Sequence, residues 1–250
     1  MHLDESLISE LSSIKKEPSW MVKRRIDAYD QFTSMPMHKF GPDLSGLNLG
    51  DVEWYVKGPQ KKKSWDDVDP EIKKKFDRLG VPEAERKFLA GLEVQVESNS
   101  VYGKLKKEWE EKGIIYTSMD EAVKKYPDLL RKYMGKAIPT SDNKFAALTD
   151  AVWSGGSFLY VPKGIVIQAP LHAYFMISTD GVGQFERTII IAEEGSSVTY
   201  VEGCSAPLYP RSNLHTGVVE RYLLKKILTL DILHFKTGLI MYIIWLRKGG

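Results

Sequence analysis

The residue best suited to chemistry is Cys204, in the stretch VEGCSAP at residues 201–207, because it is the only cysteine among 250 residues. A cysteine thiolate is a nucleophile and a metal ligand, whereas a buried thiol acts as a small hydrophobic group. One cysteine excludes a disulfide within the chain. The residue type alone leaves both interpretations of Cys204 open, inert packing and reactive thiol.

The neighbours of Cys204 decide how easily it ionises. If residues 196–204 form one strand, Glu202 and Cys204 lie on the same face of that strand. A carboxylate there disfavours the thiolate, so a reactive thiol needs a cation nearby. Arg187 and Arg211 are the candidates that the sequence offers.

Metal-ligand motifs are missing from the sequence. There is no CxxC, no HExxH and no closely spaced pair of histidines, and the five histidines are scattered at positions 2, 38, 172, 215 and 234. We therefore expect no preformed zinc site and assign no metal ligands. His172 is expected to be a partly buried imidazole with a structural role.

Phosphate-binding and acyl-transfer motifs are missing as well. Gly181-Val182-Gly183 lacks the GxxxxGK[ST] pattern, and Ser154 does not complete a GxSxG motif. The lysine runs 61–63 and 73–75 are interspersed with acidic residues, and the net charge is only +2. A solvated helix face explains these runs better than a nucleic-acid surface.

The first half of the chain is predicted to be mainly helical. Helices are expected over residues 17–32, from apolar residues at 22, 26 and 29, and from Pro70, with Asp69 as N-cap. Ser118 to Glu121 form a capping box before a third helix. Apolar residues at 101, 105 and 109 have helical spacing too.

After Asp150 the pattern changes to short strands. The runs SFLYVP, IVIQ, LHAYFMI, QFERTIIIA and SVTYVEG are rich in β-branched and aromatic residues and are separated by tight turns. No helical stretch lies between them, which argues against a doubly wound α/β sheet and leaves a sandwich, a barrel or a stacked β-helix.

Six stretches together resemble one family, the SufB/SufD scaffolds that assemble iron-sulfur clusters in the SUF system. They are EPSWMVKRRIDAYDQFTSMPMHKFGPDLSGL, SWDDVDPEIKKKFDRLGVPEAERKFLAGLEVQVES, DNKFAALTDAVWSGGSFLYVPKG, APLHAYFMIS, GQFERTIIIAEEGSSVTYVEGCSAPLY and SNLHTGVVE. The resemblance runs in order from about Glu17 to Glu220 and is closer to SufB than to SufD.

The resemblance implies an α+β fold, in which a helical N-terminal region precedes the start of a right-handed parallel β-helix. Three parts are expected: residues 1–140, mainly helical; residues 141–220, a partial β-helix core; and an unassigned tail at 221–250. The most apolar window of the tail holds nine residues, too few to span a bilayer as a helix.

The resemblance also implies a scaffold, not an enzyme. Its partners would be a SufC-type ATPase and a SufD-type paralogue, with sulfur supplied by a cysteine desulfurase and with no nucleic acid or membrane. Cys204 would accept sulfur as a persulfide, beside the candidate neighbours Glu202, Arg187, Arg211 and His215. An iron-sulfur cluster would form transiently in the full-length complex, and none is expected to bind stably to this chain. The polar start MHLDESLISEL lacks the features of a signal peptide, so the cytoplasm is the expected compartment.

The chain departs from the family at two places. Met176 and Ser178 stand where family members often carry Arg and Asn on the path that sulfur takes. After Glu220 the family's strands and C-terminal domain are not recognisable, which suggests a truncated or frame-shifted product.

Two alternatives stay open. One is a SufD-like paralogue with a structural role. The other is a β-helix enzyme acting on carbohydrates, which needs two carboxylates across a cleft. Asp180, Glu186, Glu193 and Glu194 are acidic, but the sequence shows no such pair.

Overall fold

A computed structural model gives the fold of the chain. It describes residues 3–37, 47–78, 89–205, 213–223, 229–237 and 241–249, the last two ranges for the backbone only. The helices are α1 (Glu5–Lys15), α2 (Ser19–Ser34), α3 (Pro70–Arg78), α5 (Lys107–Glu110), α6 (Met119–Lys125), α7 (Pro127–Tyr133) and α8 (Lys144–Val152), with short 3-10 turns at Leu49–Asp51, Trp65–Asp67 and Thr140–Asp142. The strands are β1 (Gly91–Val96), β2 (Asn99–Leu105), β3 (Ile115–Ser118), β4 (Ser157–Val161), β5 (Leu171–Met176), β6 (Gly183–Ala192), β7 (Ser197–Ser205), β8 (Leu214–Leu223), β9 (Thr229–Thr237) and β10 (Met241–Gly249).

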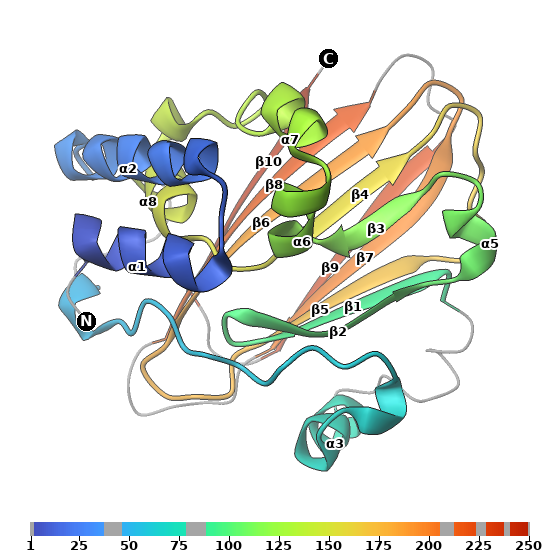
Figure 1. The fold of residues 1–250 in the computed structure, drawn as a ribbon, viewed down its shortest axis with the longest axis horizontal. Coiled ribbons are helices and arrows are strands. Elements are labelled where there is room, and N and C mark those ends of the chain that lie inside the picture. The colour runs from blue at the N-terminus through green and yellow to red at the C-terminus, as the bar shows by residue number, and fades with distance from the viewer. Residues whose placement is uncertain are drawn as a thin grey trace.

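The strands form two five-stranded sheets, visible one behind the other in Figure 1. The first sheet has the order β2-β1-β5-β7-β9 and the second the order β10-β8-β6-β4-β3. From β4 to β10 successive strands belong alternately to the two sheets. Each of them pairs in parallel with the strand two positions along the chain, as β4 does with β6 and β5 with β7. The β1–β2 and β3–β4 pairs are antiparallel.

This architecture corrects the expected fold. The chain is an α/β protein with two mixed sheets, and the described residues show neither a closed nor a solenoid sheet, so the right-handed parallel β-helix is wrong. The period of a strand shows which of its faces is buried, but not which strand lies beside it. Strands β1, β2 and β3 come from the region expected to be mainly helical. Strand β1 pairs in parallel with β5, while β2 and β3 are antiparallel strands at one edge of each sheet.

In the first half of the chain two predicted helix caps are confirmed and one predicted helix is wrong in part. Asp69 caps α3 and Ser118 caps α6, because their side-chain oxygens accept hydrogen bonds from the amides of Glu71 (2.8 Å) and Glu121 (3.4 Å). The helix expected from the spacing of residues 101, 105 and 109 is wrong over its first part, since β2 covers Asn99–Leu105. Val101 and Leu105 are buried, and β2 pairs with β1. These tertiary contacts outweigh the helical spacing of the apolar residues.

Helix α2 is confirmed, but its buried stripe lies beside the expected one, whose Ile26 and Tyr29 are half-buried against the core. Its buried side chains include Met21, Ala28, Phe32 and a charged residue, Arg25. Arg25 is 0% exposed because Glu17 accepts two of its hydrogen bonds at 2.7 Å and the carbonyl groups of α8 and its end accept two more. A buried arginine is tolerated only with such partners, and hydrophobic spacing cannot reveal them.

The helices and the two sheets pack through three interfaces. Helices α1, α2, α6, α7 and α8 cover the outer face of the second sheet, and α3 covers the outer face of the first sheet (Figure 1). Between the two sheets lies a core with side chains from β3 to β7, including Leu159, Phe175, Ile190, Tyr200 and Cys204. The lone cysteine therefore lies in the interior between the sheets.

Candidate functional site between the sheets

Strands β6, β7 and β8 bring three side chains together in this interior. Glu186 comes from β6, Cys204 from the end of β7 and His215 from the start of β8. In the parallel β6–β8 pair, Glu186 stands in register with Gly217, which has no side chain. His215, two residues earlier, therefore has room to reach Glu186 diagonally across the ladder.

The three residues form a compact, water-excluded group. One ligand-type atom of each, a carboxylate oxygen, the thiol sulfur and an imidazole nitrogen, lies within 4.8 Å of the other two. His215 Nε2 lies 3.1 Å from Glu186 Oε1. The exposed fractions are 2% for Glu186, 4% for Cys204 and 0% for His215. We call this group the thiol site.

The electrostatics of the thiol site follow from burial. Burial raises the pKa of the Glu186 carboxyl well above its usual value, and the negative charge of Glu202 adds to the rise. Neither oxygen of Glu186 accepts a hydrogen bond from a described residue, so its 3.1 Å contact with His215 is not aligned as one. An acid, an imidazole and a thiol in one apolar interior can exchange a proton, or together bind a cation.

Arg187 does not serve Cys204, contrary to the expectation. Its guanidinium contacts Asp150 and lies 2.5 Å from Glu220 Oε2, on the face of β6 that the helices cover. Adjacent residues of a strand point to opposite faces, so Glu186 faces the sheet interior and Arg187 faces away from it. The sequence placed Arg187 near the thiol by proximity along the chain and overlooked this alternation.

The other candidate neighbours lie at different places. Glu202 is on the same face of β7 as Cys204, and its carboxylate accepts hydrogen bonds from Tyr200 (2.8 Å) and Thr188 (3.4 Å). Arg211 lies outside the described residues. The β7–β9 register pairs Cys204 with Lys236.

Glu186 is the site residue that sequence reasoning missed. The sequence showed it only as one of four acidic residues for a carbohydrate-active enzyme. A usable signal was present, because Glu186 interrupts the apolar strand QFERTIIIA at an inward-facing position. The residue spacing of known metal-binding motifs does not reveal this group, because the three residues come from three strands and not from one helix or loop.

Two positions on the expected sulfur path do not face the thiol site. Met176 belongs to the core cluster that α3 covers, with Val94 and Val96. Ser178 donates its hydroxyl hydrogen bond to Glu97 at 2.7 Å. His172 was expected to be partly buried and is buried, and burial lowers the pKa of its imidazole to about 4, against an opposing effect of Glu202.

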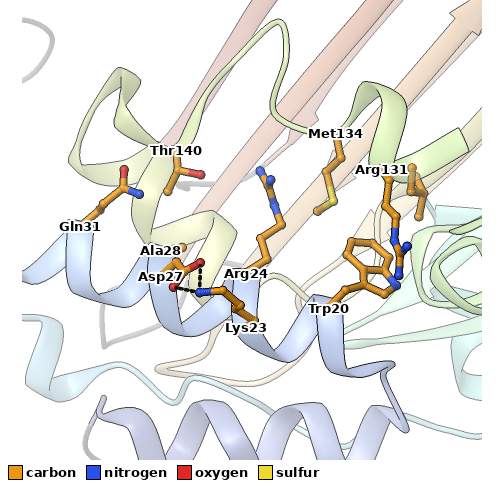
Figure 2. Close-up of a pocket in the computed structure, with 10 residues that line it drawn as sticks. Trp20, Lys23, Arg24, Asp27, Ala28, Gln31, Arg131, Met134 and Thr140 are labelled. Atoms are coloured by element: carbon orange, nitrogen blue, oxygen red, sulfur yellow. Dashed lines mark hydrogen bonds and ion pairs between the residues drawn. The ribbon is translucent and has the colours of Figure 1, made fainter. Parts of the chain in front are cut away.

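Surface features offer weaker sites. A pocket of about 390 Å³ lies between α2, α7 and the turn at Thr140 (Figure 2), but its charged side chains already have partners, and Arg131 lies over the ring of Trp20. Lys23 forms an exposed ion pair with Asp27 on α2 (Figure 2). Arg24 pairs with the buried Asp150. The acidic residues weighed for a carbohydrate-active enzyme are apart, since Glu186 is interior and Glu194 pairs with Lys163 at the surface.

The fold and the thiol site thus define an α/β protein with two facing sheets and a buried thiol, imidazole and carboxyl group between them. Comparison with known proteins then places the chain. Residues 89–173 match the family described as SufBD protein N-terminal region, and residues 175–226 match the SUF system FeS cluster assembly, SufBD core domain. The chain belongs to the SufBD family.

Curated relatives agree with this family. The chain is 53% identical over 219 residues to the iron-sulfur cluster assembly SufBD family protein SAUSA300_0822 of Staphylococcus aureus (strain USA300). It is 52% identical over 219 residues to the corresponding protein SH2035 of Staphylococcus haemolyticus (strain JCSC1435). In both comparisons the match covers 87% of this chain and 47% of the relative, so the chain spans about half the length of these relatives.

The family assignment does not separate SufB from SufD, since both family descriptions cover the two together. All three residues of the thiol site fall within the part that matches the core domain, residues 175–226. Within the described part of the chain, no helix is long and apolar enough to cross a membrane.

Proposed function

We propose that this chain receives sulfur for iron-sulfur cluster assembly and that Cys204 is the acceptor. The observation that carries the proposal is the position of Cys204 Sγ beside an imidazole and a carboxyl group, inside the part of the chain that matches the SufBD core domain. A thiol reacts as its thiolate, so it needs a neighbouring group that takes its proton. His215 and Glu186 are the groups within reach.

The transfer is a thiol exchange without net oxidation. The Cys204 thiolate attacks the outer sulfur of a donor persulfide, a new S–S bond forms on Cys204, and the S–S bond of the donor breaks. The donor leaves as a thiolate and takes up a proton. His215 or Glu186 holds the proton of Cys204 during the attack. Because Cys204 is 4% exposed, the donor reaches its sulfur only when the site opens.

The wider role follows from the family. As a scaffold-type protein the chain would act with a SufC-type ATPase and a SufD-type paralogue, and a cysteine desulfurase would supply the sulfur. The ATPase activity would reside in the SufC-type partner. A four-iron cluster takes about four thiolate-type ligands, so a chain with one cysteine shares the cluster with other chains or holds none.

The test is transfer of labelled sulfur from a desulfurase persulfide to the full chain. We expect label on the wild type, read by intact mass before and after reduction, and none on Cys204→Ser. The matched control is Ser205→Ala, which changes the next residue of β7 and keeps the thiol. Equal labelling of wild type and Cys204→Ser would remove the case for Cys204.

The roles of His215 and Glu186 need separate variants. Whichever of His215→Gln and Glu186→Gln removes the group that takes the proton should slow labelling by about a hundredfold, the lower end of the effect of a general base. Far-ultraviolet circular dichroism of each variant shows whether it is folded. A wild type that takes no label, yet co-purifies with a SufC-type ATPase, would favour the SufD-like structural role instead.

A further inference from the structure

The thiol site also has the composition of a metal site. Thiolate sulfur, imidazole nitrogen and carboxylate oxygen are the three ligand types that Zn²⁺ and Fe²⁺ accept in proteins. Glu186 and His215 from the paired strands β6 and β8, and Cys204 from β7 of the facing sheet, supply one of each in a buried interior. A site built on strands holds its ligands more precisely than one built on loops.

The distances fit a single ion after a small adjustment. Bond lengths of about 2.0–2.1 Å to nitrogen or oxygen and about 2.3 Å to sulfur place tetrahedral ligand atoms roughly 3.3–3.6 Å apart. The Glu186 Oε1 to His215 Nε2 separation of 3.1 Å is already close to this value. No pair of the three ligand atoms exceeds 4.8 Å, so the widest pair must close by about 1.2 Å at most.

The charge around the site favours a cation. Glu186 is buried without an aligned hydrogen bond from any described residue, so its ionised form is costly unless a cation compensates it. Glu202 adds negative potential from β7 of the facing sheet, as its effect on Glu186 shows. The guanidinium of Arg187 lies on the other face of β6 and does not neutralise the pair.

We propose that Glu186, Cys204 and His215 bind one divalent transition-metal ion of the Zn²⁺ or Fe²⁺ type. Three protein ligands leave a fourth position open, which is the pattern of reactive rather than purely structural sites. This goes beyond the proposed sulfur transfer, because the ion and an incoming sulfur compete for the same Sγ atom. A metal-loaded chain should therefore take up persulfide sulfur more slowly than the metal-free chain.

The direct test is an anaerobic Co²⁺ titration of the full chain without an affinity tag and without a sulfur donor. Co²⁺ replaces Zn²⁺ in such sites and reports thiolate ligation by a sulfur-to-cobalt charge-transfer band. We expect one equivalent bound with that band, and its loss when Zn²⁺ is added. Cys204→Ser should lose the band, while Glu186→Gln and His215→Gln should each weaken binding by at least tenfold.

The control is Glu202→Gln, which removes a nearby carboxylate that is not among the three ligands and keeps its hydrogen bonds to Tyr200 and Thr188. It should keep the band, with no more than a few-fold change in affinity. A second readout avoids variants altogether: because Cys204 is the only cysteine, one equivalent of Zn²⁺ should slow its alkylation in the wild type.

The outcomes separate this proposal from sulfur transfer. No charge-transfer band in the wild type, or the same spectrum in Cys204→Ser, would overturn the metal site. An unchanged alkylation rate with Zn²⁺ would do the same. Sulfur labelling is measured without metal, so a chain that binds Co²⁺ but takes no label refutes only the proposed function.

Discussion

Replacement of Arg187 by Met is expected to lower the free energy of unfolding by about 4 kcal/mol at pH 7. Arg187 is 1% exposed and bridges two fully buried carboxylates, Asp150 and Glu220. Burial works to raise the pKa of Asp150, but Arg187 and Arg24 outweigh it and hold that pKa below its usual value. Without the guanidinium, one of the two carboxylates loses its main compensating charge.

The magnitude follows from the proton that must replace the arginine. Asp150 keeps Arg24 at 2.7 Å, and Glu220 keeps its hydrogen bonds from three backbone amides and a tyrosine hydroxyl, so one added proton suffices. Protonating a carboxyl with a pKa near 4 at pH 7 costs about three times 1.36, or about 4 kcal/mol. This agrees with the roughly 3–5 kcal/mol found when one partner of a buried ion pair is removed.

The assay is urea denaturation followed by tryptophan fluorescence, at pH 7 and at pH 5. The penalty should fall to about 1.4 kcal/mol at pH 5, because the carboxyl then takes up its proton more easily. Arg187→Lys keeps the positive charge and should lose less free energy of unfolding than Arg187→Met. It can be compared with the wild type at both pH values if the Met variant is too unstable to measure. Lys23→Ala, at an exposed ion pair with Asp27, should change stability by no more than about 0.5 kcal/mol.

Two results would refute this reasoning. The first is a penalty below about 1 kcal/mol at pH 7, or one that does not shrink at pH 5. The second concerns the thiol site: because Arg187 faces away from Cys204, the folded fraction of Arg187→Lys should take up persulfide sulfur as the wild type does. Slower uptake by that folded fraction would mean that Arg187 acts on the thiol after all.

Three further predictions concern a buried carboxyl group, a helix cap and a glycine with a positive φ. Burial raises the pKa of Glu93 to about 7, against the opposing effect of Lys61, so the folded state holds this proton more tightly than the unfolded state and stability falls as pH rises from about 4.5 to 7. Glu93→Gln should therefore gain roughly 3 kcal/mol over wild type at pH 8 and almost nothing at pH 4.5 in the same denaturation assay, and an equal gain at both pH values would contradict the shift. Asn143 accepts hydrogen bonds from two amides at the start of α8, at 2.9 and 3.0 Å, so Asn143→Ala should cost about 1 kcal/mol while Asn143→Asp costs less; equal losses would argue against capping. Gly156 has a φ of +93° and a Cβ there would overlap the backbone of Arg187, so Gly156→Ala should lower the thermal midpoint by several degrees, and an unchanged midpoint would show that this approach is not tight.

Much of the local structure was predictable because its causes lie within a few residues. The caps of α3 and α6 depend on side chains that bond to amides two or three residues away. The strand over QFERTIIIA was predictable because its apolar run requires burial, and every residue of β6 is indeed buried. The face of α2 was not predictable, since Arg25 is buried by partners more than a hundred residues away.

The site was predictable in part. Cys204 attracts attention as the only cysteine, and His215 was among its candidate neighbours, but the roles of both remain proposals. Glu186 was missed because the sequence does not show that β6 and β8 pair in one sheet opposite β7 of the other. Arg187 was misplaced because adjacent residues of β6 point to opposite faces, so Glu186 faces the thiol site and Arg187 faces the helices.

The sequence by itself determined the membership in the SufBD family, the succession of short strands after Asp150 and the presence of a single thiol. Only the tertiary structure decided which strands pair, and it replaced the expected β-helix with two mixed sheets. It also decided which charged groups are in contact: Arg187 pairs with Asp150, and Glu186 lies against His215 beside Cys204. The physical reason is that strand pairing and the burial of charged side chains depend on partners distant in the chain. Local sequence patterns do not reveal which residues these partners are.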